Sequence, residues 1–154
     1  MEPLRLTILG QAASKANSRK IVTIGGKPRV IKSKEARAFM TSARRQIPPA
    51  CRVRLSGPVC VTLRMFYLTE RPDLDESVVL DALQDHYVRT RMPNGRVRRD
   101  LVQAGCICND RQVREKHVFH HIDRRNPRVE VEIRGIAPTE DMFAGDLANE
   151  RLPF

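Results

Sequence analysis

The chain has 154 residues, which is enough for one domain with a hydrophobic core and a short tail. Lysine and arginine number 28 against 18 aspartates and glutamates, and the formal net charge of +10 is far from the near-neutral balance of a typical cytosolic enzyme. No apolar run reaches the length of a membrane span, and the N-terminus has no apolar leader segment. We therefore expect a soluble cytoplasmic protein that does not engage a membrane.

The charge is unevenly distributed along the chain. Residues 138–154 carry a net charge of −3, which leaves about +13 on residues 1–137 by subtraction. Such a basic body favours a polyanion as its partner. We predict one folded basic domain over residues 1–137, followed by an acidic, flexible C-terminal tail over 138–154.

The N-terminal part of the chain predicts a strand, a loop and a hairpin. The apolar run Leu4–Leu9 predicts the first strand. Residues 10–20 are small, polar and basic, which is typical of an exposed loop that faces phosphates. Apolar stretches on both sides of Gly25-Gly26 predict a β-hairpin over residues 21–31.

The middle of the chain predicts a helix and the clearest strand of the sequence. Ser33 is a suitable N-cap for a helix that runs to about Ile47, where Pro48-Pro49 ends it. Apolar residues occupy every second position of Val59–Tyr67. This period of two predicts a strand with one face directed to the core.

The C-terminal half predicts a short helix, a basic insertion and further strands. A helix is expected over Ser77–Gln84. Residues 86–104 are rich in arginine around the turn Pro93-Asn94-Gly95, which predicts a basic flap or hairpin. The remaining expected strands are Cys106–Cys108, Val113–Phe119 and Val129–Ile133. This order predicts a single α+β domain in which two main helices accompany a mixed β-sheet.

Six carboxylates gather within residues 70–85 of this otherwise basic chain. They are Glu70, Asp73, Asp75, Glu76, Asp81 and Asp85, and the only basic residue among them is Arg71. A basic surface can hold phosphates while carboxylates hold a divalent cation. The combination indicates a metal-dependent activity on nucleic acid.

The pair Asp73 and Asp75 is expected directly at the end of the clearest strand. Residues i and i+2 of an extended chain project to the same side, so we expect the two carboxylates to converge on one cation while Leu74 faces the core. Magnesium prefers a few carboxylate oxygens and keeps several waters. Asp110, which ends another short apolar stretch, is the expected third ligand, whereas Glu115 falls on the opposite strand face and is not counted as one.

Cysteines and histidines leave a different interpretation open. The four cysteines, Cys51, Cys60, Cys106 and Cys108, lack the spacing of a zinc knuckle. We expect them to be buried thiols without disulfides. The alternative is a zinc-stabilised nucleic-acid module built on Cys106 and Cys108 with His117, His120 and His121. These histidines are otherwise expected to contact phosphates or solvent, with a general base among them as the other possibility.

Three segments in the same order resemble the RusA family of Holliday-junction resolvases. They are Arg71-Pro72-Asp73-Leu74-Asp75, Asp81-Ala82-Leu83 and Asn109-Asp110-Arg111-Gln112-Val113. The region Lys32–Arg37, which opens a helix after a hairpin, is also similar. The resemblance spans roughly residues 5–134 without the insertion at 86–104.

The resemblance implies a homodimeric, Mg²⁺-dependent endodeoxyribonuclease of DNA recombination and repair. It implies that the enzyme nicks four-way DNA junctions symmetrically by phosphodiester hydrolysis, in the cytoplasm of a bacterial or phage-infected cell. Asp73, Asp75 and Asp110 then correspond to the catalytic metal ligands, and Mn²⁺ is expected to substitute for Mg²⁺.

The chain departs from the family pattern at two positions. Glu76 stands where the family has Asn, either as an additional metal ligand or as a first-turn helix residue favoured by the helix dipole. The family lysine in the following helix is replaced by Ser77 or Val79, depending on the alignment. Candidate substitutes for its charge are Arg71, Lys116 and the arginines of 86–104.

Two interpretations of function therefore follow from the missing lysine. The first is an active junction-resolving nuclease, and the second is a branched-DNA-binding protein with weak or no turnover on the same fold. Both require DNA contacts from the basic segments. The expected DNA-binding residues are Lys15, Asn17, Arg19, Lys20, Arg89, Arg91, Arg96, Arg98 and Arg99.

Overall fold

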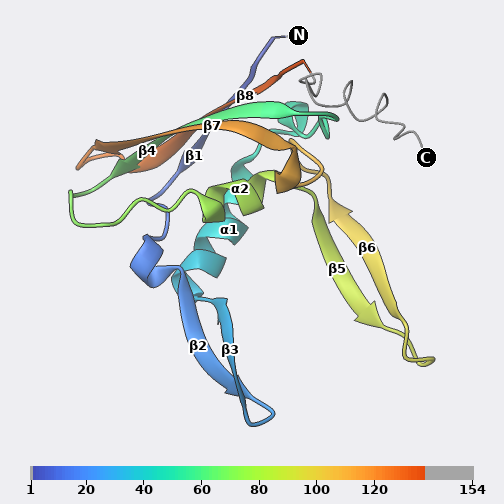
Figure 1. The fold of residues 1–154 in the computed structure, drawn as a ribbon. Coiled ribbons are helices and arrows are strands. Elements are labelled where there is room, and N and C mark those ends of the chain that lie inside the picture. The colour runs from blue at the N-terminus through green and yellow to red at the C-terminus, as the bar shows by residue number, and fades with distance from the viewer. Residues whose placement is uncertain (1, 138–154) are drawn as a thin grey trace, which may run out of the picture.

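The computed structural model describes residues 2–137, so the predicted acidic tail over 138–154 lies outside the described residues. Its centre is a four-stranded sheet in the order β1-β8-β4-β7. In this sheet β4 and β7 are parallel and the other neighbours antiparallel. The four strands are β1 (Leu4–Leu9), β4 (Val59–Tyr67), β7 (Val113–Ile122) and β8 (Arg128–Gly135). The prediction of an α+β domain with a mixed sheet is confirmed (Figure 1).

Strand β4 is a central strand of the sheet, and its bounds match the prediction. One of its faces is fully buried and consists of Val59, Val61, Leu63, Met65 and Tyr67. The other face carries Cys60, Thr62, Arg64 and Phe66, of which only Cys60 is fully buried. The period-two pattern therefore identified the core side of the sheet correctly.

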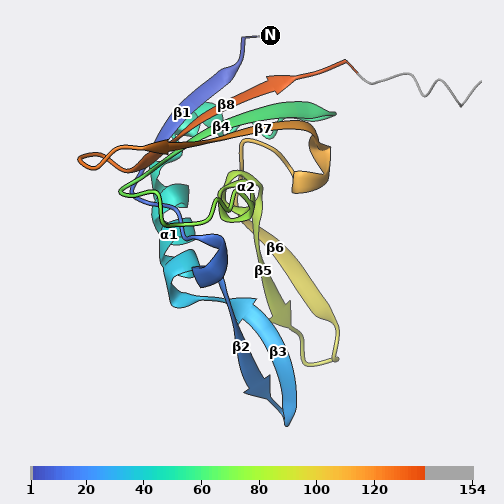
Figure 2. The ribbon, with the colours of Figure 1, turned by 60° about the vertical axis from the view of Figure 1, so that its left-hand side comes forward.

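Helices α1 (Lys34–Gln46) and α2 (Ser77–Leu83) lie on the same side of the sheet (Figure 2). The Ser33 hydroxyl caps α1 by accepting a hydrogen bond from the backbone N–H of Ala36 at 3.1 Å. Phe39 and Met40 of α1 and Val79 of α2 join the same buried cluster as the inner face of β4. None of the helices in residues 2–137 is long and apolar enough to span a membrane.

Two β-hairpins extend away from the sheet on the side of the helices (Figures 1 and 2). The first consists of β2 (Arg19–Ile24) and β3 (Lys27–Lys32), and the second of β5 (His86–Arg91) and β6 (Val97–Gln103). Gly25 and Gly26 both have positive φ, +59° and +77°, as a two-residue hairpin turn requires. Both predicted hairpins are confirmed.

A β-bulge at the start of the β4–β7 pair determines which way the side chains of β7 face. Val59 pairs with Val113 and Cys60 with Glu115, so Arg114 is an extra residue in β7. From there on, the even-numbered residues of β7 face the helices and the odd-numbered residues face the other side. Without the bulge, the odd-numbered residues of β7 would face the helices instead.

Two local predictions are wrong. Residues 10–20 are not simply an exposed loop, because they contain the short helix η1 (Lys15–Asn17) and bury Ala12, Ala13 and Ser18. Cys106–Cys108 is not a strand: only Ile107 makes isolated bridges, to Leu55 and Gln84. In both places small or sulfur-containing residues pack against the core. Their polar neighbours in the sequence hide this burial from a pattern-based prediction.

Candidate metal and phosphate site

The loop that connects β4 to α2, residues 68–76, carries the two carboxylates predicted to bind metal, and we call it the acidic loop. β4 ends at Tyr67, so residues 68–72 separate it from Asp73, and the prediction that the pair directly follows the strand is wrong. Asp73 is exposed, whereas Asp75 is buried with 8% of its surface accessible. The two carboxylates therefore do not form one equivalent pair: Asp73 faces solvent and Asp75 faces the first turn of α2.

The Asp75 side chain is held by the beginning of α2. Its Oδ1 atom accepts hydrogen bonds from the backbone N–H of Ser77 at 3.0 Å and from the Ser77 hydroxyl at 2.6 Å. Burial alone would raise the pKa of Asp75, but the hydrogen bonds from Ser77 and Ser18 and the positive charge of Arg19 outweigh it and lower that pKa. Asp75 is consequently an anion at neutral pH.

The next residue, Glu76, forms an ion pair with the sheet. Its carboxylate lies 2.6 Å from Nζ of Lys116 on the helix-facing side of β7. Burial tends to raise the pKa of Glu76, but the hydrogen bond from Lys116 overcomes this and lowers it. Of the predicted substitutes for the family lysine, Lys116 is thus adjacent to the acidic loop, although Glu76 already neutralises its charge.

His120 lies four residues after Lys116 on the same face of β7 and contacts the same region. Its Nε2 atom lies 3.3 Å from the backbone carbonyl oxygen of Pro72, and its ring stacks on Tyr67 with centroids 4.8 Å apart. The expectation that this histidine only contacts phosphate or solvent is therefore incomplete. Because Lys116 and His120 are an even number of residues apart, the bulge brings both of them to the acidic loop.

Tyr67 contributes a polar group that sequence reasoning assigned only to the core. Its hydroxyl is buried and has no hydrogen-bond partner of normal geometry in residues 2–137, although the backbone N–H of Asp75 is near enough to lower its pKa. Burial raises the pKa of Tyr67, and the negative charges of Asp75 and Glu76 act in the same direction. The hydroxyl is therefore protonated and neutral beside the acidic loop. Its position there follows from where β4 ends in the fold, which the sequence alone does not show.

A pocket of about 430 Å³ adjoins the carboxylates. It lies between residues 11–17 and residues 71–73, with Glu35 of α1 also in its wall. The backbone N–H of Lys15 donates to the carbonyl oxygen of Asp73 at 3.3 Å, which joins the two walls. Arg71 and Asn17, both predicted to serve the site, line this pocket.

Asp110, the predicted third ligand, lies at the other end of α2. It begins the short helix η3 (Asp110–Gln112), is exposed, and its backbone N–H donates to Oε1 of Gln84 at 3.2 Å. The seven residues of α2 separate it from Asp75 by roughly 10 Å. Among residues 2–137, Asp73, Asp75 and Asp110 do not form a group of ligand atoms within 4.8 Å, so the expected convergence is not met.

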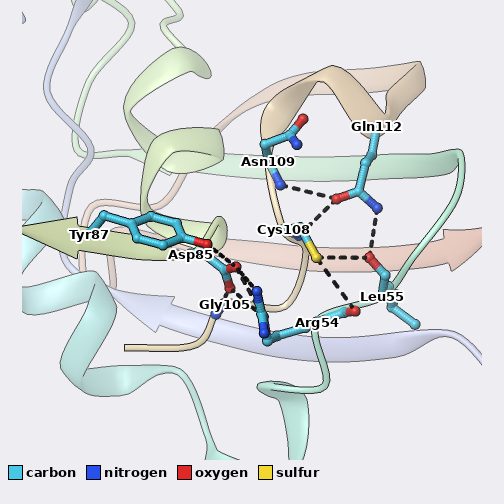
Figure 3. Close-up of polar contacts among 8 residues, drawn as sticks. All are labelled: Arg54, Leu55, Asp85, Tyr87, Gly105, Cys108, Asn109 and Gln112. Atoms are coloured by element: carbon cyan, nitrogen blue, oxygen red, sulfur yellow. Dashed lines mark hydrogen bonds and ion pairs between the residues drawn. The ribbon is translucent and has the colours of Figure 1, made fainter. Parts of the chain in front are cut away.

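Two other carboxylates of residues 70–85 are structural. The buried Asp85 side chain accepts hydrogen bonds from Arg54 at 2.8 and 3.0 Å and from the backbone N–H of Gly105 at 2.8 Å (Figure 3). These contacts join both ends of the β5–β6 hairpin to the segment before β4. Asp81 of α2 pairs with Lys32 of β3 at 2.8 Å, which connects the first hairpin to the helix layer.

The segment around Asp110 is itself fixed by Gln112. Its side-chain Oε1 accepts from the backbone N–H groups of Cys108 and Asn109, and its Nε2 donates to the carbonyl oxygen of Leu55 (Figure 3). Asn109 completes a capping box with Gln112 at the start of η3. The Asn-Asp-Arg-Gln motif thus has a structural explanation besides any role in metal binding.

The basic residues predicted to contact DNA lie in η1 and on the two hairpins. Residues 19–32 contain five lysines and arginines and no acidic residue. On the second hairpin, Arg98 pairs with Asp100 at 2.9 Å and Arg99 lies over the Tyr87 ring, 3.9 Å from its centroid. The guanidinium groups of Arg89, Arg91 and Arg96 make no ion pair with any carboxylate of residues 2–137. Each hairpin also exposes apolar side chains, among them Ile21 at 75% and Val97 at 60%.

A different set of residues could hold a metal ion on the sheet face that points away from the helices. One ligand atom each of Cys60, Glu115 and His117 lies within 4.8 Å of the others. The zinc alternative built on Cys106 and Cys108 has no such geometry among the described residues. Burial raises the pKa of the Cys106 thiol to about 12, in keeping with a core role.

The cysteines are all free thiols. Three of them are buried as expected, whereas Cys108 is only half-buried.

Comparison with known proteins adds no further assignment, since no protein-family model and no curated protein matches the chain significantly.

Proposed function

We propose that this chain is a Mg²⁺-dependent, structure-specific endodeoxyribonuclease that resolves four-way DNA junctions. The observation that carries the proposal is the ionised Asp75 two residues after the exposed Asp73, which lines a pocket together with Arg71. Carboxylate oxygens are the donors that Mg²⁺ prefers, so the chemistry of this pair fits the ion. The resemblance of the same segment to RusA-type resolvases supports the same function.

The residues of the pocket have distinct roles in this proposal. Asp73 and Asp75 hold the Mg²⁺ ion, which when bound lowers the pKa of a water and neutralises charge on the attacked phosphate. Arg71 in the wall of the pocket, and Lys15, whose backbone N–H bonds to the carbonyl oxygen of Asp73, bind the phosphates on either side of the scissile bond. Lys116 releases Glu76 and turns to the scissile phosphate, which supplies the charge of the missing family lysine.

Asp110 can complete the metal site only after a rearrangement. Its exposed position in a three-residue helix leaves its side chain unrestrained, whereas Asp75 is fixed by Ser77. We propose that DNA binding draws η3 toward Asp73, which requires the contacts of Gln112 and the hydrogen bond from Asp110 to Gln84 to open. A homodimer then provides two such sites for paired nicks in opposite strands.

The two basic hairpins are the proposed holders of the junction arms. They extend on the same side of the sheet as the acidic loop (Figure 1). Strongly basic ribbons of this kind attract the phosphate backbone without reading its sequence. Arg89, Arg91 and Arg96 are the arginines of the second hairpin best placed for this, because they have no carboxylate partner in residues 2–137.

A second candidate function is a branched-DNA-binding protein without turnover. The observation that favours it is the ion pair of Lys116 with Glu76, which leaves the acidic loop with no unpaired lysine on β7. The separation of Asp110 from Asp73 points the same way. Such a protein would use the same hairpins to bind junctions and would leave them uncut.

Cleavage of a labelled four-way junction by point variants distinguishes the two candidates. We expect the wild-type chain to cut in Mg²⁺, and Asp73→Asn and Asp75→Asn to bind the junction but not cut it. Glu132→Gln is the matched control, because its carboxylate pairs with Arg5 on the other side of the sheet. Binding without cutting by the wild type, in both Mg²⁺ and Mn²⁺, would establish the second candidate.

A further inference from the structure

The face of the sheet opposite the helices brings three unlike ligand side chains together at the start of β4 and β7. Cys60 pairs directly with Glu115, and the next residue on the same face of β7 is His117. The β-bulge produces this arrangement, because an uninterrupted pairing would set Arg114 opposite Cys60. Sulfur, oxygen and nitrogen atoms of the three residues then lie within 4.8 Å of one another.

The donor set selects the class of metal. A thiolate, an imidazole and a carboxylate are the three ligand types that Zn²⁺ accepts, usually in tetrahedral geometry. Mg²⁺ takes oxygen donors in an octahedral arrangement and does not use a thiolate. A site with Cys60 is therefore chemically unlike the carboxylate pair of Asp73 and Asp75, and it lies on the other face of the sheet.

Of the three residues, Cys60 is fixed in place, whereas Glu115 can turn. Cys60 is only 1% exposed and lies on a central strand, so its sulfur position is fixed. Within residues 2–137, the ion pair of Glu115 is with Arg134, the β8 residue opposite Cys60, at 3.6 Å, and both side chains are half-exposed. Such a surface pair contributes little, so turning Glu115 toward a metal costs little.

We propose that Cys60, Glu115 and His117 bind one Zn²⁺ ion, with a water in the fourth position. Binding transfers the thiol proton of Cys60 to solvent and forms a bond between sulfur and zinc. The ion connects β4 to the edge strand β7 through side chains as well as through the backbone ladder. It stabilises the strand that carries Lys116 and His120 on its opposite face.

The test uses the full-length chain after removal of metal by a chelator. Titration with Co²⁺ is expected to give one equivalent of a tetrahedral complex with thiolate-to-cobalt charge-transfer absorption, which one equivalent of Zn²⁺ displaces. Zn²⁺ is also expected to raise the melting temperature of the chain. Wild-type protein that shows neither the absorption nor the shift in melting temperature would overturn the proposal.

Variants of Cys60 and His117 test the assignment of the site. Cys60→Ser should abolish the charge-transfer absorption, and His117→Ala should weaken binding by more than the roughly 10- to 100-fold that loss of an outer-shell partner costs. His117 is exposed, so this variant stays informative if the Cys60 variant does not fold. Cys108→Ser is the matched control, because this half-buried thiol lies outside the group, and it should bind like the wild type. Undiminished binding by Cys60→Ser or His117→Ala would contradict the proposal.

Discussion

Asp75 shows at the scale of one residue how the fold keeps a partly hidden carboxylate charged. The desolvation that raises its pKa is outweighed by donors from two serines and by Arg19. A carboxyl group whose pKa is lowered on folding stabilises the native state at pH values above its unfolded pKa. That stabilisation is lost as the pH falls from the ordinary value of 3.8 through the lowered one.

Replacing Ser77 by Ala tests this account of Asp75. The change removes the hydroxyl donor at 2.6 Å and leaves the backbone donor in place. We expect the free energy of unfolding to fall by about 1 kcal/mol at neutral pH. Urea denaturation at neutral and acidic pH measures it, and the difference from wild type should shrink once Asp75 is protonated.

Ser56→Ala is the matched control, because Ser56 is exposed and outside every strand and helix. It should leave stability unchanged at both pH values. A loss of stability in Ser77→Ala that persists undiminished in acid would show that the hydroxyl does not act through the Asp75 carboxylate.

At the scale of secondary-structure elements, the sequence correctly predicted several features that depend on local patterns. The bounds of β4, the Ser33 cap of α1 and the turn at Gly25-Gly26 all follow from side-chain period, capping chemistry and the positive φ of glycine. These features need no knowledge of the rest of the chain.

The elements that sequence did not predict depend on contacts between distant segments. The bulge that rephases β7 exists only in the pairing of β4 with β7, and it decides that Lys116 reaches the acidic loop. The grouping of Cys60 with Glu115 depends on the same pairing. Motif order placed Asp73 and Asp110 in one site, but the intervening α2 keeps them apart in the structure.

The anchor of the second hairpin gives a prediction at this scale. Asp85→Ala leaves the buried backbone N–H of Gly105 without its acceptor, so we expect a loss of about 1–3 kcal/mol in the free energy of unfolding. Urea denaturation followed by circular dichroism measures it. Asp100→Ala, which breaks the exposed pair with Arg98 on the same hairpin, should cost less than about 1 kcal/mol. Equal losses in the two variants would contradict the anchoring role of Asp85.

At the scale of the whole molecule, the positive and negative charges occupy different parts of the fold. Much of the positive charge of residues 1–137 lies on the two hairpins that extend from the sheet, next to the acidic loop (Figure 1). In the proposed function this distribution separates two tasks: the two hairpins would supply affinity for phosphates and the acidic loop a site for a cation. A protein that only needed solubility would not require such segregation.

Salt dependence tests the role of the hairpins. Each phosphate contact that is removed should reduce the slope of log affinity against log salt by about 0.9. We expect this reduction for Arg29→Gln on the first hairpin and for Arg89→Gln on the second, measured by binding of a labelled junction at several salt concentrations. Arg5→Gln, on the sheet face opposite the helices, is the control and should keep the wild-type slope. Wild-type slopes in both hairpin variants would exclude the hairpins from the interface.

The most direct test of the central claim compares two DNA substrates of the same sequence. Wild-type protein is incubated in Mg²⁺ with a labelled four-way junction and with the corresponding linear duplex, and the cut positions are mapped on each strand. We predict a pair of symmetric nicks in opposite strands of the junction, dependence on the divalent ion, and no cutting of the duplex. Equal cutting of both substrates, or a junction that is bound and stays intact, would contradict the claim that this chain is a junction-resolving nuclease.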